Sequence, residues 1–268
     1  MRVVTWNLWW RFGPWRSRQQ AIASTLGGLA PDVVCLQEVW SEESGDDQVV
    51  ELAEALGLHP ARTPERFRNG LSFGNAVLSR YPITEQVCRD LPPFDGSSHR
   101  QALGVRLAAP QGVVPVVCTH LDHRFDRSAV RQDQVAAVLE LVAELRNGAD
   151  DHPAILAGDL NAVPTSDEIR MITGERPPPV PGMVMSDAWP QRGDGPGHTW
   201  DDANPHVVDS TWPRRRIDYV FVSWPRPRPT GNVNAAFLAG IDPVEAVVPS
   251  DHYAVVVDLD EGPSRPSG

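Results

Sequence analysis

Polar side chains of catalytic types stand at the carboxyl ends of several apolar runs in this sequence. Asn7 ends RVVTWNL, Glu38 lies near the end of DVVCLQEV, His120 closes VVPVVCTH, and Asp159 and Asn161 close AILAGDLN. A single Asp or Asn after a strand is usually turn or capping chemistry. Repeated cases predict a shared crevice, because ligand sites form at strand ends, where a rigid backbone holds the side chains in place.

Two further segments place carboxylates and a histidine beside apolar runs. Asp218 lies at the start of IDYVFVSW, and Asp251 and His252 stand just before AVVVDLD. An acidic residue next to a histidine is compatible with a metal ligand beside a general base, each with its own orienting partner. Taken singly, a buried Asp satisfied by loop amides is the commoner outcome, so the prediction depends on all of these segments together.

The elements that must position these side chains are short β-branched and apolar runs bounded by turn residues. Several are continuously apolar, which predicts strands buried on both faces and covered by helices or a second sheet. The predicted strands are residues 2–8, 32–39, 74–80, 102–108, 113–120, 154–160, 217–224 and 254–260, and the predicted helices are residues 16–30, 46–57, 126–146 and 165–173. Residues 174–216 are rich in Gly, Pro, Asp and Trp and show no sustained period, which predicts a long, partly ordered excursion.

The ordered series TWNL, LQEV, GNAVLSRYPI, THL, GDLNAVP, RIDYVFV and SDHYAVV resembles the endonuclease/exonuclease/phosphatase superfamily. This group includes pancreatic-type deoxyribonucleases, apurinic endonucleases, neutral sphingomyelinases and inositol-polyphosphate phosphatases. The resemblance runs from Val3 to about Leu259 and implies an α/β (α+β) fold, in which two packed mixed β-sheets form a sandwich flanked by helices in four layers. No composition break marks a linker, so we expect one such domain over residues 1–260 and a disordered tail at 261–268.

The resemblance implies a metal-dependent phosphodiester hydrolase and assigns roles to matching positions. Glu38 matches the main divalent-metal ligand, assisted by Asn7 and Asp251. Asp159 and Asn161 match the pair that contacts the attacking water, the scissile phosphate or a second metal. Mg²⁺ suits such oxygen donors, since it takes one or two carboxylates and keeps several waters for substrate phosphate to displace. Mn²⁺ is the alternative cofactor.

The same resemblance implies an acid–base set. His252 matches the general base, Asp218 its orienting carboxylate, and His120 a histidine that contacts the phosphate or helps to protonate the leaving group. A histidine with an ordinary pKa near 6.5 takes a proton from water near neutral pH, and a carboxylate at its other nitrogen fixes the tautomer. Metal-assisted attack of this water on the phosphate ester requires no covalent enzyme intermediate.

Other polar residues are candidates for substrate contact. Asn75 lies on a strand that walls the site in the family, where a phosphate or ribose contact and a structural amide are equally expected. Trp200 and Arg216 belong to or follow the long excursion, where substrate selectivity usually lies; core packing for Trp200 and a solvated surface for Arg216 are the alternatives. Asp122 and His123, directly after His120, are expected to support the site rather than to bind metal.

Composition narrows the classes of function. The 268 residues carry 24 Lys and Arg against 35 Asp and Glu, a net charge of −11, and all 24 are arginine. An acidic chain disfavours a histone-like or membrane-surface role, because non-specific binding of polyanions comes largely from Lys and Arg. No segment approaches the ~18 apolar residues of a membrane span, so we expect no membrane insertion.

The cysteines and the first residues indicate the compartment. Cys35, Cys88 and Cys118 cannot all pair with one another, and two of them lie in apolar runs, as is typical of a reducing environment. The start MRVVTWNLWWRFGPWR has no apolar stretch of the kind found in signal peptides. We expect a cytoplasmic protein, and a monomer.

The substrate is left open between nucleic acid, a phospholipid, a nucleotide and another small phosphorylated molecule. A small or single-stranded phosphodiester is favoured, because the sequence has no hydrophobic hairpin of the kind that sphingomyelinase-like activity would need. Clusters of Arg at 11–18, 62–68 and 214–228 offer only local positive charge. One alternative is a nuclease acting on DNA or RNA within the same superfamily. The other is a non-catalytic binding protein that keeps the fold, which should carry substitutions at the metal and base positions, and none is present.

Overall fold

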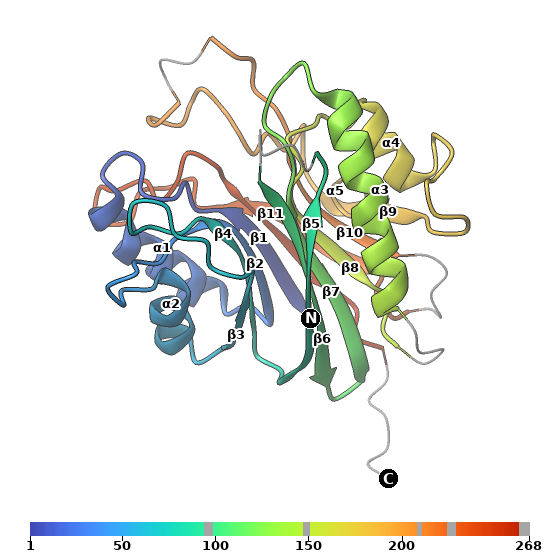
Figure 1. Ribbon diagram of the computed structural model, residues 1–268, viewed down its shortest axis with the longest axis horizontal. Coiled ribbons are helices and arrows are strands. Elements are labelled where there is room, and N and C mark those ends of the chain that lie inside the picture. Colours follow the sequence, from blue (N-terminus) through green and yellow to red (C-terminus); the bar gives the residue numbers. More distant parts are fainter. Residues whose placement is uncertain (94–98, 147–150, 208–210, 224–228, 263–268) are drawn as a thin grey trace.

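The computed structural model describes residues 1–93, 99–146, 151–207, 211–223 and 229–262, which form two six-stranded β-sheets (Figure 1). The first sheet runs in the order β11 (Val233–Ala239), β12 (Ala254–Leu259), β1 (Arg2–Asn7), β2 (Val33–Val39), β4 (Gly74–Ser79) and β3 (His59–Arg62). The second runs in the order β5 (Ile83–Leu91), β6 (Arg100–Ala109), β7 (Gly112–His120), β8 (Ile155–Asp159), β10 (Asp218–Ser223) and β9 (Met185–Asp187).

The two sheets pack face to face, and helices cover their outer faces. Helices α1 (Trp15–Leu29) and α2 (Gln48–Leu56) share a buried apolar cluster with the first sheet. Helices α3 (Ser128–Leu145) and α4 (Asp167–Thr173) share another with the second sheet, and the short helix α5 (Trp189–Arg192) follows β9. The expected four-layer sandwich of two mixed sheets flanked by helices is confirmed.

Burial on both faces explains why the interior strands are continuously apolar. Val3 of β1 belongs to the cluster between the sheets, whereas its neighbour Val4 belongs to the cluster beneath α1 and α2. Successive side chains of a strand point to opposite faces, so a strand covered on both sides has no solvent-facing set of positions. The apolar runs are therefore the signature of a middle layer.

The strand pairing brings candidate functional residues to one edge of the sandwich. β7 and β8 are parallel and end together, with His120 opposite Asp159. β10 is antiparallel to β8, so its first residue, Asp218, also lies opposite Asp159. In the first sheet, the parallel pair β1 and β2 ends with Asn7 opposite Gln37.

Four strands and one helix depart from the sequence-based expectation. Strands β3, β5, β9 and β11 and helix α5 were not predicted, and β9 and α5 lie within the 174–216 excursion, where β9 pairs with β10. Residue 224 of a predicted strand and residues 263–268 of the predicted tail lie outside the described residues, as do Arg226 and Arg228. Among the described helices, none combines the length and apolar composition needed to cross a membrane.

Candidate active site

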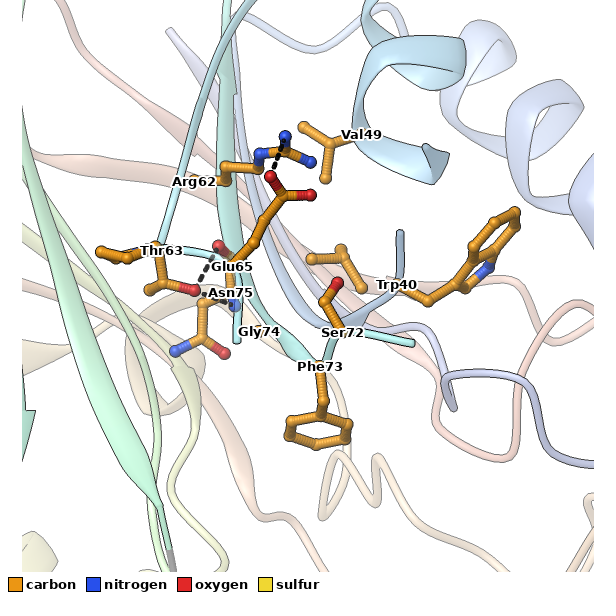
Figure 2. Close-up of a pocket in the computed structure, with 11 residues that line it drawn as sticks. Trp40, Val49, Arg62, Thr63, Glu65, Ser72, Phe73, Gly74 and Asn75 are labelled. Atoms are coloured by element: carbon orange, nitrogen blue, oxygen red, sulfur yellow. Dashed lines mark hydrogen bonds and ion pairs between the residues drawn. The ribbon is translucent and has the colours of Figure 1, made fainter. Parts of the chain in front are cut away.

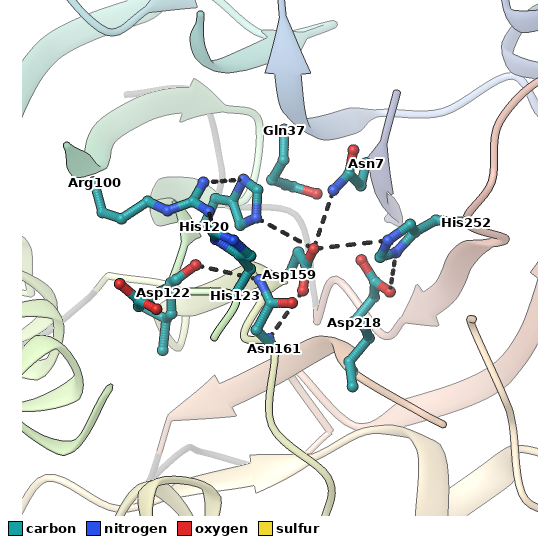
Figure 3. Close-up of polar contacts among 12 residues, drawn as sticks. Asn7, Gln37, Arg100, His120, Asp122, His123, Asp159, Asn161, Asp218 and His252 are labelled. Carbon is teal, nitrogen blue, oxygen red and sulfur yellow. Dashed lines mark hydrogen bonds and ion pairs between the residues drawn. The ribbon is translucent and has the colours of Figure 1, made fainter. Parts of the chain in front are cut away.

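Asp159 is the centre of a network of buried polar side chains at this edge (Figure 3). Its Oδ2 accepts a hydrogen bond of 3.0 Å from Asn7 Nδ2 and lies 3.4 Å from His120 Nε2 and 3.9 Å from His252 Nε2. Its Oδ1 accepts a hydrogen bond of 2.9 Å from the backbone N–H of Asn161. The end of β8 therefore joins residues from both sheets around one carboxylate.

His252 and Asp218 form a buried pair across the two sheets. His252 Nδ1 lies 2.9 Å from Asp218 Oδ2, and the His252 carbonyl accepts a hydrogen bond of 2.9 Å from Trp6 Nε1. Burial alone would lower the pKa of His252, but the carboxylates of Asp218 and Asp251 outweigh it and raise that pKa well above 6.5. Because Nδ1 is engaged by Asp218, Nε2 is the nitrogen that faces Asp159.

The free nitrogen of His252 is placed for work on a water molecule. The 3.9 Å between His252 Nε2 and Asp159 Oδ2 exceeds a direct hydrogen bond. A water molecule can hydrogen-bond to two polar groups that do not contact each other directly. This geometry can hold a water between a base and a carboxylate at the end of β8.

His120 is held by an arginine that the sequence analysis missed. Arg100 Nη1 lies 2.9 Å from His120 Nδ1, and Arg100 Nη2 lies 3.2 Å from His123 Nδ1 (Figure 3). A guanidinium can only donate, so His120 Nδ1 accepts and the neutral ring carries its proton on Nε2, which faces Asp159. Burial, with the charge of Arg100 and His252, lowers the pKa of His120 well below 6.5, which keeps the ring neutral.

Glu38 occupies an irregularity in β2. The register between β2 and β4 shifts between Gln37 and Val39, and Glu38 has a φ of 57°. A left-handed conformation is uncommon for a residue other than Gly, Asn or Asp, and bulges of this kind re-aim a side chain. Desolvation and the charge of Asp159 raise the pKa of Glu38, although Arg100, His252 and a hydrogen bond from Asn7 oppose them.

A buried arginine of α1 holds the loop that follows Asn7 and the loop that precedes Asp251. Arg18 donates hydrogen bonds to the carbonyls of Leu8, Trp9, Trp10, Phe12 and Pro249. Desolvation raises the pKa of Asp251 to about 6, with Glu38 adding to the shift and His252 and Arg18 opposing it. Arg18 was also missed, because an arginine within a helix has no spacing that marks it.

The carboxylates of the site fit a divalent cation. Glu38, Asp159 and Asp251 all have raised pKa values. Ionising the three carboxyl groups together therefore costs free energy. Asp218 Oδ1 is buried and has no hydrogen-bond partner among the described residues. Carboxylate and amide oxygens are the donors that Mg²⁺ prefers, and a cation would offset this repulsion.

Two sets of donors are available within the described residues. Single ligand atoms of Asp159, Asp218 and His252 lie within 4.8 Å of one another. The set predicted from the sequence is Glu38 with Asn7 and Asp251. Asn7 Nδ2 donates a hydrogen bond to Asp159 Oδ2, and the charge of Glu38 adds to the raised pKa of Asp251, but the role of the three as cation ligands stays a prediction. A cation bound by the first set would occupy a ring nitrogen of His252, either the one that would act as the base or the one bonded to Asp218, whereas the second set leaves both nitrogens free of the cation.

Asn75, at the start of β4, lines one pocket with Gly74 and Thr63 (Figure 2) and a second pocket with Arg100 and His120. Its Nδ2 donates a 2.9 Å hydrogen bond to the carbonyl of Gln101 in the other sheet, and its backbone N–H donates to Thr63 Oγ1 at 3.2 Å. A Cβ on Gly74 would lie 2.4 Å from the same Thr63 oxygen, so a larger residue there would displace the Thr63 side chain. The amide of Asn75 thus has a structural bond, and its contact with substrate stays a prediction.

Arg216 and Trp200 are not brought to the carboxylates in the same way. Arg216 is buried, with Nη1 2.7 Å from Asp187 Oδ2, so the geometry does not support the predicted substrate contact. Trp200 lies at the rim, 4.9 Å from the guanidinium of Arg215. Burial lowers the pKa of Arg215, and the charges of Asp159 and Asp218 oppose this shift.

Arg131 and Gln134 of α3 hold the segment that follows His120. Gln134 Oε1 accepts a 2.9 Å hydrogen bond from the backbone N–H of Asp122, and Arg131 Nη1 donates to the carbonyls of Asp122 and Arg124. Arg131 Nε also pairs with Glu168 Oε1 at 2.6 Å. These bonds tie the loop that follows β7 to α3 and α4.

Comparison with known proteins identifies similar chains. The sequence model of the Endonuclease/Exonuclease/phosphatase family matches residues 4–252. The uncharacterized protein YbhP of Escherichia coli strain K12 is 34% identical over 145 residues, which are 50% of this chain and 54% of YbhP. Protein angel homolog 2 of Danio rerio is 29% identical over 177 residues, which are 60% of this chain and 30% of that protein. The match therefore spans about half the length of the bacterial relative.

Solved structures share the fold over nearly the whole chain. An endonuclease/exonuclease/phosphatase from Beutenbergia cavernae has a TM-score of 0.74 at 28% identity, covering 100% of this chain and 73% of that one. Danio rerio TDP2, complexed with a single-strand DNA product, has a TM-score of 0.76 at 21% identity, covering 96% and 97%. The human nocturnin catalytic domain has a TM-score of 0.73 at 22% identity, covering 97% and 94%.

Proposed function

Because this chain belongs to the endonuclease/exonuclease/phosphatase family, we propose that it is a Mg²⁺-dependent phosphodiester hydrolase in which His252 activates the attacking water. The observation that carries the proposal is the 2.9 Å contact between His252 Nδ1 and Asp218 Oδ2, with Nε2 directed at Asp159. A histidine oriented by a carboxylate at one nitrogen is a general base at the other. The surrounding carboxylates supply oxygen donors for the cation.

The residues divide the chemistry of ester hydrolysis between them. Neutral His252 would take a proton from the water at Nε2, while Asp218 holds the ring and stabilises its charged form. The neighbouring carboxylates raise the pKa of His252, and a bound cation would offset their charge and so favour the neutral base. The neutral His120 presents Nε2–H, which is suited to a phosphate oxygen or to the departing oxygen. A bound divalent cation would polarise the phosphate and stabilise the leaving alkoxide, and Glu38, Asn7 and Asp251 would hold it.

Nucleic acid is the substrate class we favour among phosphodiesters. Zebrafish TDP2 was solved with a single-strand DNA product, and it shares the fold over 96% of this chain. A small phosphodiester is the alternative, because the net charge of −11 offers no broad positive surface for a polyanion. The cysteines are free, and Cys35 and Cys118 are buried, in keeping with the cytoplasmic location that we propose.

The base assignment is tested by hydrolysis of bis-p-nitrophenyl phosphate with Mg²⁺ and with EDTA. We expect Mg²⁺-dependent turnover that falls by roughly 10²–10⁴ in His252→Ala, in the range that general-base catalysis contributes. Turnover of the Asp218→Asn variant should fall by a smaller factor, because the base remains but loses its orienting partner. His59→Ala is the matched control, since His59 is an exposed histidine on β3. Near-normal turnover of His252→Ala would exclude His252 as the base.

The metal ligands are tested separately by titration calorimetry with Mn²⁺ as the probe. If Glu38, Asn7 and Asp251 hold the cation, Glu38→Gln should weaken binding by at least roughly tenfold, while His252→Ala leaves it nearly unchanged. The reverse pattern would move the cation to Asp159, Asp218 and His252. Binding without any hydrolysis across phosphodiester, nucleic-acid and inositol-phosphate substrates would instead favour a non-catalytic binding protein.

A further inference from the structure

Two exposed aromatic rings stack on each other at the rim of the site. Phe125 and Trp212 have ring centroids 3.6 Å apart and an interplanar angle of 10°. Phe125 is nevertheless 45% exposed and Trp212 is 49% exposed. Large aromatic side chains left in water at a functional edge commonly mark a binding surface. Their placement therefore calls for a ligand with an apolar, flat part.

The stack continues through an arginine to a further aromatic ring. The guanidinium of Arg215 lies 4.3 Å from the centroid of Phe125 and 4.9 Å from the centroid of Trp200. Trp200 and Arg215 are also joined by a pair of backbone hydrogen bonds, 3.0 and 2.8 Å long. Trp212, Phe125, Arg215 and Trp200 thus form one layered unit, called here the aromatic stack.

The aromatic stack adjoins the candidate catalytic residues along the chain and in space. Phe125 follows His120 by five residues in the loop after β7, and Arg215 precedes Asp218 by three residues before β10. β7 and β10 flank β8, so these two loops meet beside the strand that ends in Asp159. The carboxylates of Asp159 and Asp218 both act on Arg215. A ligand on the stack would therefore sit next to a phosphate bound at the site.

We propose that the aromatic stack binds a nucleobase next to the scissile phosphate, so that the substrate is single-stranded nucleic acid or a nucleotide ester. This inference rests on the proposed hydrolase function and names its substrate class. Bases stack on aromatic rings whatever their sequence, and a guanidinium stacks beside them or contacts the adjoining phosphate. A base within a duplex has both faces covered, so the stack favours unpaired bases.

The charge of the protein supports stacking as the source of affinity. With a net charge of −11 and no lysine, the chain offers little of the diffuse electrostatic attraction that holds most proteins on nucleic acid. A stacking surface with one guanidinium provides affinity without diffuse electrostatic attraction. A lipid chain is the less suitable occupant, because the exposed surface of the stack is made of planar rings rather than aliphatic side chains.

The test compares two substrates that differ only in their bases. One is a fluorescent single-stranded oligonucleotide, and the other is the same phosphodiester chain with abasic tetrahydrofuran units. We expect the wild-type enzyme to favour the first in kcat/KM by at least roughly tenfold. The double variant Trp212→Ala with Phe125→Ala should lower kcat/KM for the base-bearing oligonucleotide by roughly ten- to hundredfold. Its kcat/KM for the abasic chain should change by less than about threefold. Trp212→Phe keeps a flat ring and should retain most of the preference.

Controls separate the aromatic stack from the rest of the enzyme. Phe237→Ala removes another exposed aromatic side chain, on β11, and should leave kcat/KM unchanged for both substrates. Equal loss on both substrates in the double variant, or no preference in the wild type while bis-p-nitrophenyl phosphate is hydrolysed, would overturn the stack as a base-binding surface. Variant-sensitive binding to sphingomyelin vesicles without a base preference would do the same and indicate a lipid.

Failure of the hydrolase proposal has a different signature. Equilibrium binding of the two labelled chains, measured by fluorescence anisotropy in EDTA, needs no turnover. Preference for the base-bearing chain that is lost in the double variant, without hydrolysis of any phosphodiester, would support the stack and contradict the enzyme. Equal binding of both chains would contradict the stack.

Discussion

Arg100 decides which nitrogen of His120 carries the proton. Its two terminal nitrogens lie 2.9 and 3.2 Å from the Nδ1 atoms of His120 and His123. Because arginine cannot accept a hydrogen bond, both Nδ1 atoms act as acceptors. We therefore treat Arg100 as a positioning residue, which keeps the Nε2–H of His120 directed at the phosphate site.

Replacing Arg100 by Gln should release this constraint. Gln offers an acceptor as well as a donor, so the His120 ring is free to protonate on Nδ1. We expect kcat to fall by roughly ten- to hundredfold, as for other groups that orient a functional histidine. The nitrogen chemical shifts of His120, measured by NMR on labelled protein, should move from the Nε2–H pattern to a mixture of tautomers.

The control for this change is Arg100→Lys. Lysine keeps the positive charge but cannot bridge two acceptors as the guanidinium fork does. The Arg100→Lys variant should therefore have less than the full activity, and only part of its His120 should be in the Nε2–H tautomer. Unchanged nitrogen shifts in Arg100→Gln, with the fold intact by circular dichroism, would rule out the positioning role.

The pairing of β7 with β8 depends on a glycine just before Asp159. A Cβ on Gly158 would lie 1.9 Å from the carbonyl oxygen of Thr119, which is backbone and cannot move aside cheaply. Gly158→Ala should therefore destabilise the protein by about 3 kcal/mol or more and displace Asp159. Urea unfolding measures the loss, and Gly28→Ala in α1, where nothing lies within 4 Å, should be neutral or slightly stabilising. A loss below about 1 kcal/mol in Gly158→Ala would mean that the strands tolerate the added atom.

The sequence predicted the interior of both sheets and missed their edges. The four strands that were not predicted, β3, β5, β9 and β11, are the four edge strands of the two sheets. An edge strand is partly open to water, so its composition lacks the apolar run of a strand buried on both faces. In β5, only Leu91 is buried, and β3 includes Pro60, which is tolerated at an edge.

The site was predictable as a set of residue types but not as a network. Strand-end motifs pointed to Asn7, His120 and Asp159, and the structure brings them together. The arginines that hold these residues carried no such signal. Arg100 begins an ordinary strand, and only the register of β6 against β7 places it beside the end of β7. Such partners follow from tertiary pairing, which spacing along the chain does not reveal.

The pairing of β1 with β12 includes an ion pair that should make stability depend on acid pH. Arg2 and Asp258 lie opposite each other and meet at 2.7 and 2.8 Å. The hydrogen bond from Arg2 lowers the pKa of Asp258. A depressed carboxyl pKa adds stability that is complete above the unfolded value of about 3.9 and is lost as pH falls toward the folded value.

Asp258→Asn should therefore lower the free energy of unfolding by about 0.5–1 kcal/mol at pH 7, the scale of a partly exposed ion pair. The difference from the wild type should narrow below about pH 4, because both proteins then lack the charge. Urea denaturation at a series of pH values checks this. Asp133→Asn, at an exposed position on α3, is the matched control. A difference that stays constant down to pH 2 would assign the loss to packing rather than to charge.

At the scale of the whole molecule, the candidate site exists only because the two sheets are packed. Asn7 of β1, Glu38 of β2 and His252, just before β12, come from the first sheet, whereas His120 of β7, Asp159 of β8 and Asp218 of β10 come from the second. The hydrogen bond between His252 and Asp218 crosses from one sheet to the other. The core between the sheets thus sets the separation of base and carboxylate as well as the stability of the fold.

The charge of the whole molecule predicts how substrate affinity depends on salt. For single-stranded nucleic acid, the logarithm of the association constant falls linearly with the logarithm of the salt concentration. The slope is about −0.7 for each phosphate that the protein neutralises. With a net charge of −11 and a placed arginine such as Arg215 at the rim, we expect about two such contacts. Between 50 and 200 mM salt, KM for a single-stranded oligonucleotide should then rise only roughly sevenfold, whereas six contacts would raise it several hundredfold. A steep dependence in steady-state kinetics would mean that a broader positive surface, rather than stacking on Trp212 and Phe125, holds the substrate.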